Sequence, residues 1–120
     1  MFEKTREDLV DRLATLIDRY DLILERTESW QNKAAHAQRL GLNPHGPVPI
    51  IMEIQTKVIE QQGLCGESIT LLLQDRALPH MFKGGVKRAE AFAAECETVL
   101  DGFDEAWSAG RSAFNERMKN

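Results

Sequence analysis

The stretch LVDRLATLIDRYDLILERTESWQNKAAHA, residues 9–37, decides the fold of this chain. Its apolar and small side chains recur at alternating steps of four and three residues, a spacing that returns them to one face of an α-helix. The members of this stripe are Leu9, Leu13, Leu16, Tyr20, Ile23, Thr27, Trp30, Ala34 and Ala37. A second apolar row widens the face, and it consists of Val10, Ile17 and Leu24. The stretch therefore predicts a long helix that packs against two neighbouring helices.

Two further stretches show helical periodicity. Residues 86–118 repeat the alternation of three-residue and four-residue steps. Residues 50–78 also carry apolar side chains at helical spacing, but Gly63 and Gly66 interrupt the pattern. One interpretation is a single helix, kinked near the glycines, and the other is two helices broken there. We favour the single helix because its length then matches the lengths of its neighbours.

The segments between these stretches have the composition of turns. Residues 41–49 contain three prolines and two glycines, which cannot continue a helix, and Gly41 supplies a signal that ends the first helix. Residues 79–85 form the second turn, in which we expect Met81 and Phe82 to close one end of the core. The predicted fold is all-α: a single domain over all 120 residues, built as an up-down-up bundle of three long antiparallel helices.

The composition excludes several classes of protein. With 42% apolar and 28% charged residues, the chain resembles an ordinary globular domain. A net charge of −4 argues against a surface that binds nucleic acid, since such a surface must be basic. No apolar run approaches the ~18 residues of a membrane span, and no signal-peptide pattern opens the chain. We therefore expect a cytoplasmic protein without membrane contact, in which Cys65 and Cys96 are buried thiols.

The sequence shows no constellation of catalytic or metal-binding residues. The histidines and cysteines lack the HExxH, CxxC and Glu-x-x-His spacings of metal sites, so we predict no metal and no cofactor. Cys65 would act as a nucleophile only with His45 or His80 beside it, and no local spacing favours that pairing. We therefore predict that the protein is not an enzyme.

The best candidate for an anion site lies where the third helix is expected to begin. Backbone amides at a helix N-terminus favour anions, and glycines and cations gather at this point. The candidate residues are Lys83, Gly84, Gly85, Lys87 and Arg88. Their order differs from that of a phosphate-binding P-loop, and a glycine turn with solvated cations is the simpler interpretation.

Acidic residues gather in the third helical stretch. They are Glu95, Glu97, Asp101, Asp104 and Glu105. Their ordinary role is to solvate the outer face of a helix. The alternative is a surface that attracts a basic partner, because a patch of one sign steers association.

Apolar residues beyond the main stripes indicate a contact with another chain. We expect Leu100, Trp107, Phe114 and Met118 to form a row on the third helix, with Ile17 and Leu24 across from it. Since Trp and Met are favoured at protein interfaces, this row is the candidate for a homodimer contact or for a partner protein. Trp30 is also expected to lie at the same level as Trp107 when the first and third helices run in parallel.

These observations favour a non-enzymatic protein–protein interaction module. We expect a helical homodimer that acts as a small regulatory inhibitor or adaptor, which binds a partner protein through an apolar helix face and blocks its assembly. The alternatives are a ligand-binding helical sensor, with a pocket near Gly63, Gly66 and His80, and a secretion-type chaperone.

Overall fold

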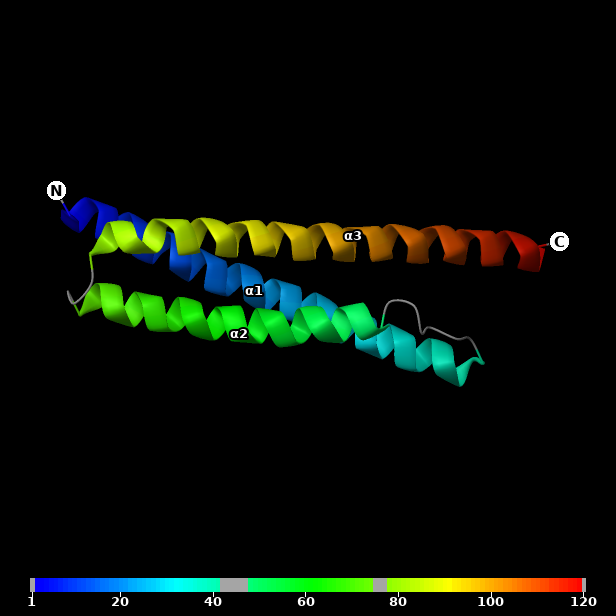
Figure 1. The fold of residues 1–120 in the computed structure, drawn as a ribbon. Helices are drawn as coiled ribbons and strands as arrows, with labels where there is room; N and C mark the ends of the chain where they lie inside the picture. The colour runs from blue at the N-terminus through cyan, green and yellow to red at the C-terminus, as the bar shows by residue number, and fades with distance from the viewer. Residues whose placement is uncertain (1, 42–47, 75–77, 120) are drawn as a thin grey trace.

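The computed structural model describes residues 2–41, 48–74 and 78–119 of the chain. Three long helices account for nearly all of this part, and a short 3-10 helix precedes the last of them. The elements are α1 (Phe2–Arg39), α2 (Val48–Leu73), η1 (Pro79–Phe82) and α3 (Lys83–Lys119). Within the described ranges there is no strand, so the all-α prediction is confirmed. The helices lie lengthwise in a rod of 68 × 20 × 16 Å (Figure 1).

The stripe predicted on residues 9–37 forms the centre of the core. Each of its nine members is buried except Ala34, which is half-buried. Tyr20 is fully buried, and its ring lies tilted against that of Phe92 at a centroid distance of 6.4 Å. Thr27 is also fully buried, and its hydroxyl donates a hydrogen bond of 2.7 Å to the carbonyl of Leu24. The buried Thr27 hydroxyl thus has its hydrogen-bond partner within α1 itself.

α1 contacts both of the other long helices, whereas α2 and α3 make few contacts with each other. Side-chain to side-chain polar contacts between α1 and α3 join residues separated by a nearly constant 74 to 78 positions, so these two helices run in the same direction. Between α1 and α2 the separation falls as α1 advances, from 41 at Asp21 to 24 at Gln31, so α2 runs in the opposite direction. Figure 1 shows α2 and α3 lying along α1 in these directions.

The structure confirms the predictions made for Gly41 and for the pair Gly63 and Gly66. Gly41 has a φ of +81°, and its amide donates a hydrogen bond of 3.0 Å to the carbonyl of Gln38, which ends α1. α2 is continuous through Gly63 and Gly66, so the single-helix interpretation is confirmed. It ends at Leu73 and not at residue 78. Most of the predicted loop at 41–49 lies outside the described residues.

The predicted turn at 79–85 is shorter than the sequence indicated. Its first four residues form η1, and α3 already begins at Lys83, so the two glycines at 84 and 85 are helical. Phe82, the last residue of η1, is half-buried against the core, and Val86 in the first turn of α3 is buried in it. Both side chains reach the core because α3 begins directly after η1. Met81 is 72% exposed, so the prediction that it closes the core is wrong, whereas Phe82 does pack there.

Candidate functional site

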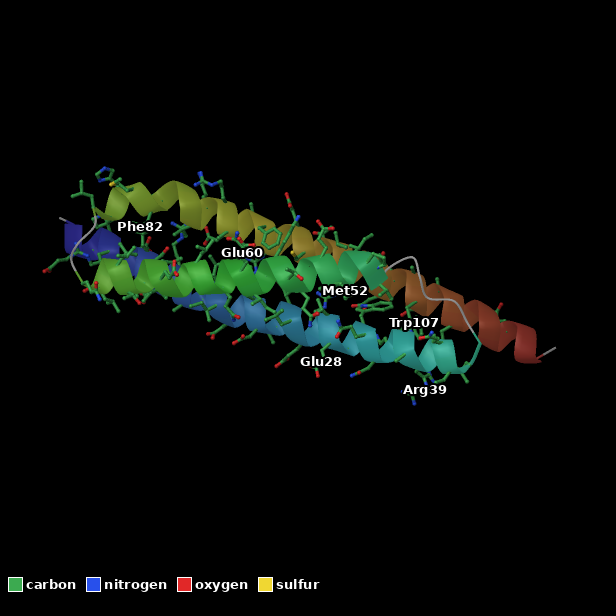
Figure 2. The ribbon with its side chains drawn as sticks, turned by 60° about the horizontal axis from the view of Figure 1, so that its bottom comes forward. Glu28, Arg39, Met52, Glu60, Phe82 and Trp107 are labelled. Atoms are coloured by element: carbon green, nitrogen blue, oxygen red, sulfur yellow. The ribbon has the colours of Figure 1, made fainter. Side chains whose placement is uncertain are left out.

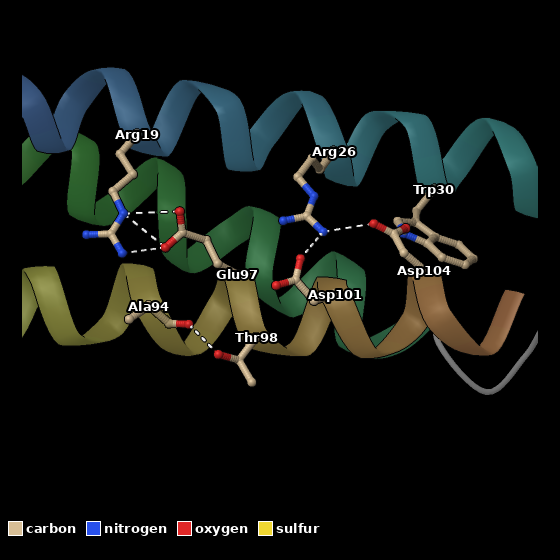
Figure 3. Close-up of polar contacts among 8 residues, drawn as sticks. All are labelled: Arg19, Arg26, Trp30, Ala94, Glu97, Thr98, Asp101 and Asp104. Carbon is tan, nitrogen blue, oxygen red and sulfur yellow. Dashed lines mark hydrogen bonds and ion pairs between the residues drawn. The ribbon is translucent and has the colours of Figure 1, made fainter. Parts of the chain in front are cut away.

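The interface between α1 and α3 is closed along one edge by a ladder of ion pairs. Arg12 binds Glu90, Arg19 binds Glu97, and seven residues further on Arg26 binds Asp104 at 2.9 Å. Each pair joins residues 78 positions apart. Because the arginines follow one another at seven-residue intervals, each rung lies about two helical turns beyond the last. Figure 3 shows the second and third rungs, where both guanidinium groups reach across from α1 to α3.

Aromatic residues close the same interface beyond the third rung. The indole nitrogen of Trp30 donates a hydrogen bond of 2.9 Å to Asp104, whose other oxygen accepts from Arg26 (Figure 3). The ring of Trp30 meets that of Trp107 edge-on at a centroid distance of 5.6 Å. The ammonium group of Lys33 lies 4.8 Å from the Trp30 ring. The prediction that the two tryptophans lie at one level is therefore confirmed.

The ladder changes the interpretation of the acidic residues on α3. Glu97, Asp101 and Asp104 are bound by arginines of α1, although the Asp101 side chain stays 66% exposed. Glu95 and Glu105 are exposed, so part of this acidic stretch borders the α1–α3 interface and part faces solvent. At the first rung, the guanidinium of Arg12 holds the pKa of the Glu90 carboxyl below its ordinary value. The arginines were not singled out from the sequence, although their seven-residue spacing matches that of the acids on α3.

The buried polar groups of the core show no catalytic arrangement. The Tyr20 hydroxyl donates a hydrogen bond of 2.7 Å to the carbonyl of Ala89, and burial raises the pKa of this hydroxyl. Burial also raises the pKa of the Cys96 thiol to about 11, and that of Cys65 in the same direction. Both thiols are thus held in the protonated form, which is a poor nucleophile. Nothing in this arrangement favours the catalytic-thiol alternative for Cys65.

The side of α1 between α2 and α3 is left open at two separate hollows, and we call this open side the groove. Near η1 it widens into a hollow of about 530 Å³, whose walls include Leu64, Cys65 and Phe92, with Arg88 at its edge. Toward the other end, a hollow of about 290 Å³ lies beside Trp107. Both hollows exist because α2 and α3 pack on α1 without closing on each other. This groove is a candidate site for a helix of another chain.

α2 differs from the other helices in what it exposes. Six of its large apolar residues are at least 43% exposed: Ile50, Met52, Ile59, Leu64, Leu71 and Leu73. Its charged residues are only Glu53, Lys57, Glu60 and Glu67. A helix that is apolar on most of its sides is typical of one buried in an assembly. Figure 2, in which Met52 and Glu60 are labelled, shows α2 at the front of the molecule.

The four members of the predicted partner row whose side chains the structure describes are buried or half-buried. Leu100 is fully buried in the core, so we correct its assignment as a contact residue. Trp107 is half-buried against Trp30. Ile17 and Leu24 are half-buried against the core, and the Ile17 carbonyl accepts a hydrogen bond of 3.1 Å from Gln62 of α2. The side chains of residues 114 and 118, Phe114 and Met118, lie outside the described part of the chain.

The candidate anion residues lie on an exposed stretch at the start of α3. Lys83, Gly84, Gly85, Lys87 and Arg88 are all exposed. The amide of Lys83 donates to the carbonyl of His80 in η1, so the preceding turn already uses part of the helix N-terminus. The Arg88 guanidinium lies over Gly84, where an added Cβ would be 3.4 Å from it. Of these residues, Gly85 and Arg88 line the hollow near η1, and Lys83, Gly84 and Lys87 do not.

No protein-family model, no curated protein and no solved structure matches this chain. Among the residues with described side chains, no group of histidines, cysteines and carboxylates could hold a metal ion. Within the same part of the chain, none of the helices is both long and apolar enough to cross a membrane. The open groove and the exposed surface of α2 are therefore the two features of the molecule from which a function can be inferred.

Proposed function

We propose that this chain is a non-enzymatic protein–protein interaction module, a small regulatory inhibitor or adaptor whose contact surface is α2. The observation that carries the proposal is the exposure of large apolar residues along this helix, next to the open groove. Exposed apolar surface beyond what a monomer needs marks interaction sites in soluble proteins. We also propose a cytoplasmic location, in keeping with two free, buried cysteines.

The simplest assembly is an up-down-up bundle that pairs with a second copy through the groove. Leu64 lines the hollow near η1. Ile50, Lys57 and Leu71 lie at seven-residue intervals from it and so share its side of α2, and we call these four residues the groove row. A two-fold axis would bring the groove row of each copy onto the groove of the other, which buries the leucines of both.

The charges beside the groove favour a second copy as its occupant. Lys57 and Arg88 are basic, and Glu95 lies seven residues after Arg88 on the same side of α3. Because both signs are present, two copies related by a two-fold axis can place opposite charges together. This surface therefore lacks the one-sign field that would repel its own copy.

Sedimentation of matched variants tests the dimer. Leu64→Asp with Leu71→Asp places charges on the groove row, and we expect it to convert a dimer at micromolar concentration into a monomer. Because both leucines are more than 40% exposed, helical content measured by circular dichroism should not change. Leu22→Asp, at a residue 60% exposed on α1, is the control and should leave the dimer intact. A wild-type protein that sediments as a monomer would contradict the dimer.

A ligand-binding sensor is the second candidate function. The hollow of about 530 Å³ lies near η1 and beside Leu64 and Cys65, close to where the sequence suggested a pocket. Its volume lies within the range of small-molecule sites, and its walls are mainly apolar. A thermal-shift screen with small apolar carboxylates would favour the sensor if one compound raises the melting temperature by several degrees. Leu64→Trp, which fills the hollow, should abolish that shift.

A further inference from the structure

A second exposed stripe lies on the side of α2 away from the groove. Its members alternate at steps of four and three residues, and we call them the outer stripe: Met52, Thr56, Ile59, Gly63, Gly66, Thr70 and Leu73. The large members Met52, Ile59 and Leu73 are 55%, 56% and 67% exposed. The Thr56 and Thr70 hydroxyls donate to carbonyls of their own helix, at 3.0 and 3.1 Å. These hydroxyls therefore need no partner from another molecule.

The glycines of the outer stripe are not explained by any contact within the described residues. Gly63 and Gly66 are helical, and glycine disfavours a helix interior relative to alanine. A Cβ added at either position would meet nothing within 4 Å. No neighbouring element of the described structure therefore requires glycine here. Glycine does permit close approach of another backbone, which at these positions can come only from outside the described residues.

Acidic residues border the middle of the outer stripe on both sides. Glu60 and Glu67 follow it along α2, and both are exposed. On the other side of the stripe, Asp21 of α1 accepts a hydrogen bond of 2.6 Å from Gln62 of α2. Glu28 lies seven residues after Asp21 on the same side of α1. Figure 2 shows Glu28 and Met52 on this part of the molecule. Lys57 lies between this border and the groove and is paired with Glu53 at 2.8 Å, so Glu60, Glu67 and Glu28 leave the border of the outer stripe mainly acidic, unlike the mixed border of the groove.

The sign of the border decides between possible occupants. Two copies of α2 packed through the outer stripe would bring Glu60 and Glu67 of one copy toward the same residues of the other. Like charges across an interface disfavour association. A helix with lysine or arginine beside its apolar side chains would instead meet opposite charges along its length.

We propose that the outer stripe binds a basic amphipathic helix of a partner protein. This inference rests on the proposed role as an interaction module, but it uses a different face of α2 from the dimer. Leucine-like side chains of the partner would pack between Ile59 and Leu73, over the two glycines. Its lysines or arginines would pair with the carboxylates of Glu60, Glu67 and Glu28.

A pair of synthetic peptides tests this proposal. The first has about 20 residues, with leucine at alternating steps of three and four and lysine at the flanking positions, and the second carries glutamate in place of each lysine. Fluorescence anisotropy with the labelled peptides should show binding of the lysine peptide alone, and added salt should weaken that binding. Equal binding of both peptides would overturn the assignment of a basic partner.

Matched variants locate the binding surface. Ile59→Asp should weaken binding of the lysine peptide by at least about tenfold, whereas Leu22→Asp should leave it unchanged, since buried apolar anchors dominate such contacts. Glu60→Gln with Glu67→Gln should weaken it by several-fold and reduce its salt dependence. If Ile59→Asp and Leu22→Asp have the same effect, the peptide does not bind at the outer stripe and the proposal fails.

The glycines offer a test in which stability and binding move in opposite directions. Gly63→Ala with Gly66→Ala should raise the melting temperature by about 5 °C or more, because alanine favours the helix and no atom stands in its way. The same variant should bind the lysine peptide about tenfold more weakly, because the methyl groups keep the partner at a distance. Unchanged or tighter binding would contradict the proposed close approach.

The dimer and the peptide site can fail separately. Leu64→Asp with Leu71→Asp should abolish the dimer but retain binding of the lysine peptide. Loss of peptide binding in Ile59→Asp together with an intact dimer would support both proposals. If Ile59→Asp instead dissociates a wild-type dimer, the outer stripe is the contact between copies, and the proposal of a basic partner is overturned.

Discussion

The α1–α3 interface and the outer surface of α2 differ in how far the chain itself completes them. Between α1 and α3, buried side chains are bordered by three arginine–carboxylate rungs and by the contact of Trp30 with Trp107. On α2, one row is buried, while large apolar residues on both flanks of that row remain exposed. The first interface needs nothing from another molecule, whereas the second surface presents apolar area that water disfavours.

The ladder contributes more to register than to stability. Its side chains are about one-third exposed or more, and pairs of this kind stabilise a protein by about 1 kcal/mol or less. Beyond each end of the ladder, α3 carries a basic residue seven positions from the last carboxylate, Lys83 at one end and Arg111 at the other. A slip of seven residues in one direction would place Arg26 opposite Arg111, and in the other direction Arg12 opposite Lys83. Like charges thus oppose both of these slips.

The largest expected effect distinguishes the two sides of α2. Leu72 is fully buried, and its neighbour Leu71 is 43% exposed. Leu72→Ala should lower the free energy of unfolding by about 3 kcal/mol, and Leu71→Ala by about 0.5 kcal/mol or less, as measured by urea denaturation at a protein concentration too low for self-association. Similar losses for both variants would mean that the groove side of α2 is covered within one chain.

A charge exchange tests the second rung of the ladder. Arg19→Glu or Glu97→Arg alone opposes like charges and should cost about 1 kcal/mol each, whereas the double exchange should recover most of that loss. Urea denaturation of the three variants and the wild type gives the coupling energy. Additive losses in the double variant would show that Arg19 and Glu97 do not interact in solution.

The smallest expected effect comes from titration of the first rung. Arg12 lowers the pKa of Glu90 in the folded protein, so the carboxylate adds stability above its unfolded pKa of about 4.3 and loses that stability as pH falls through the lowered value. Wild type should therefore be more stable to unfolding than Glu90→Gln by about 0.5 kcal/mol at pH 7, and the difference should vanish at acid pH, below the lowered pKa. A difference that stays constant between these pH values would exclude the ion pair.

The sequence was sufficient for the features that depend on one helix alone. The stripe on residues 9–37 predicted α1 and its buried face because each member lies on the same side of a single helix. The common level of Trp30 and Trp107 is the exception, a feature of two helices that could be predicted from helix direction and length. The continuity of α2 through Gly63 and Gly66 was predicted correctly but for a reason that does not hold, because α2 has 26 residues and does not match the 38 of α1 or the 37 of α3.

The features that depend on two helices could not be derived in this way. A row beside the main stripe faces either a second neighbour or solvent, and periodicity does not distinguish these cases; Leu100 proved to be in the core. The arginine ladder requires the register between segments 78 residues apart. The start of α3 at Lys83 overrides the glycines that follow it, because Phe82 and Val86 must both reach the core.

Hydroxyl-radical footprinting over a range of protein concentrations tests most directly the claim that α2 is the side left open for other proteins. We expect Leu64 and Leu71 to become protected as the protein concentration rises. Leu22 on α1 is 60% exposed and Leu40 at the end of α1 is 65% exposed, and both should remain reactive. Protection of Leu22 or Leu40 in place of the groove row, or unchanged reactivity of Leu64 and Leu71 at every concentration, would contradict this claim.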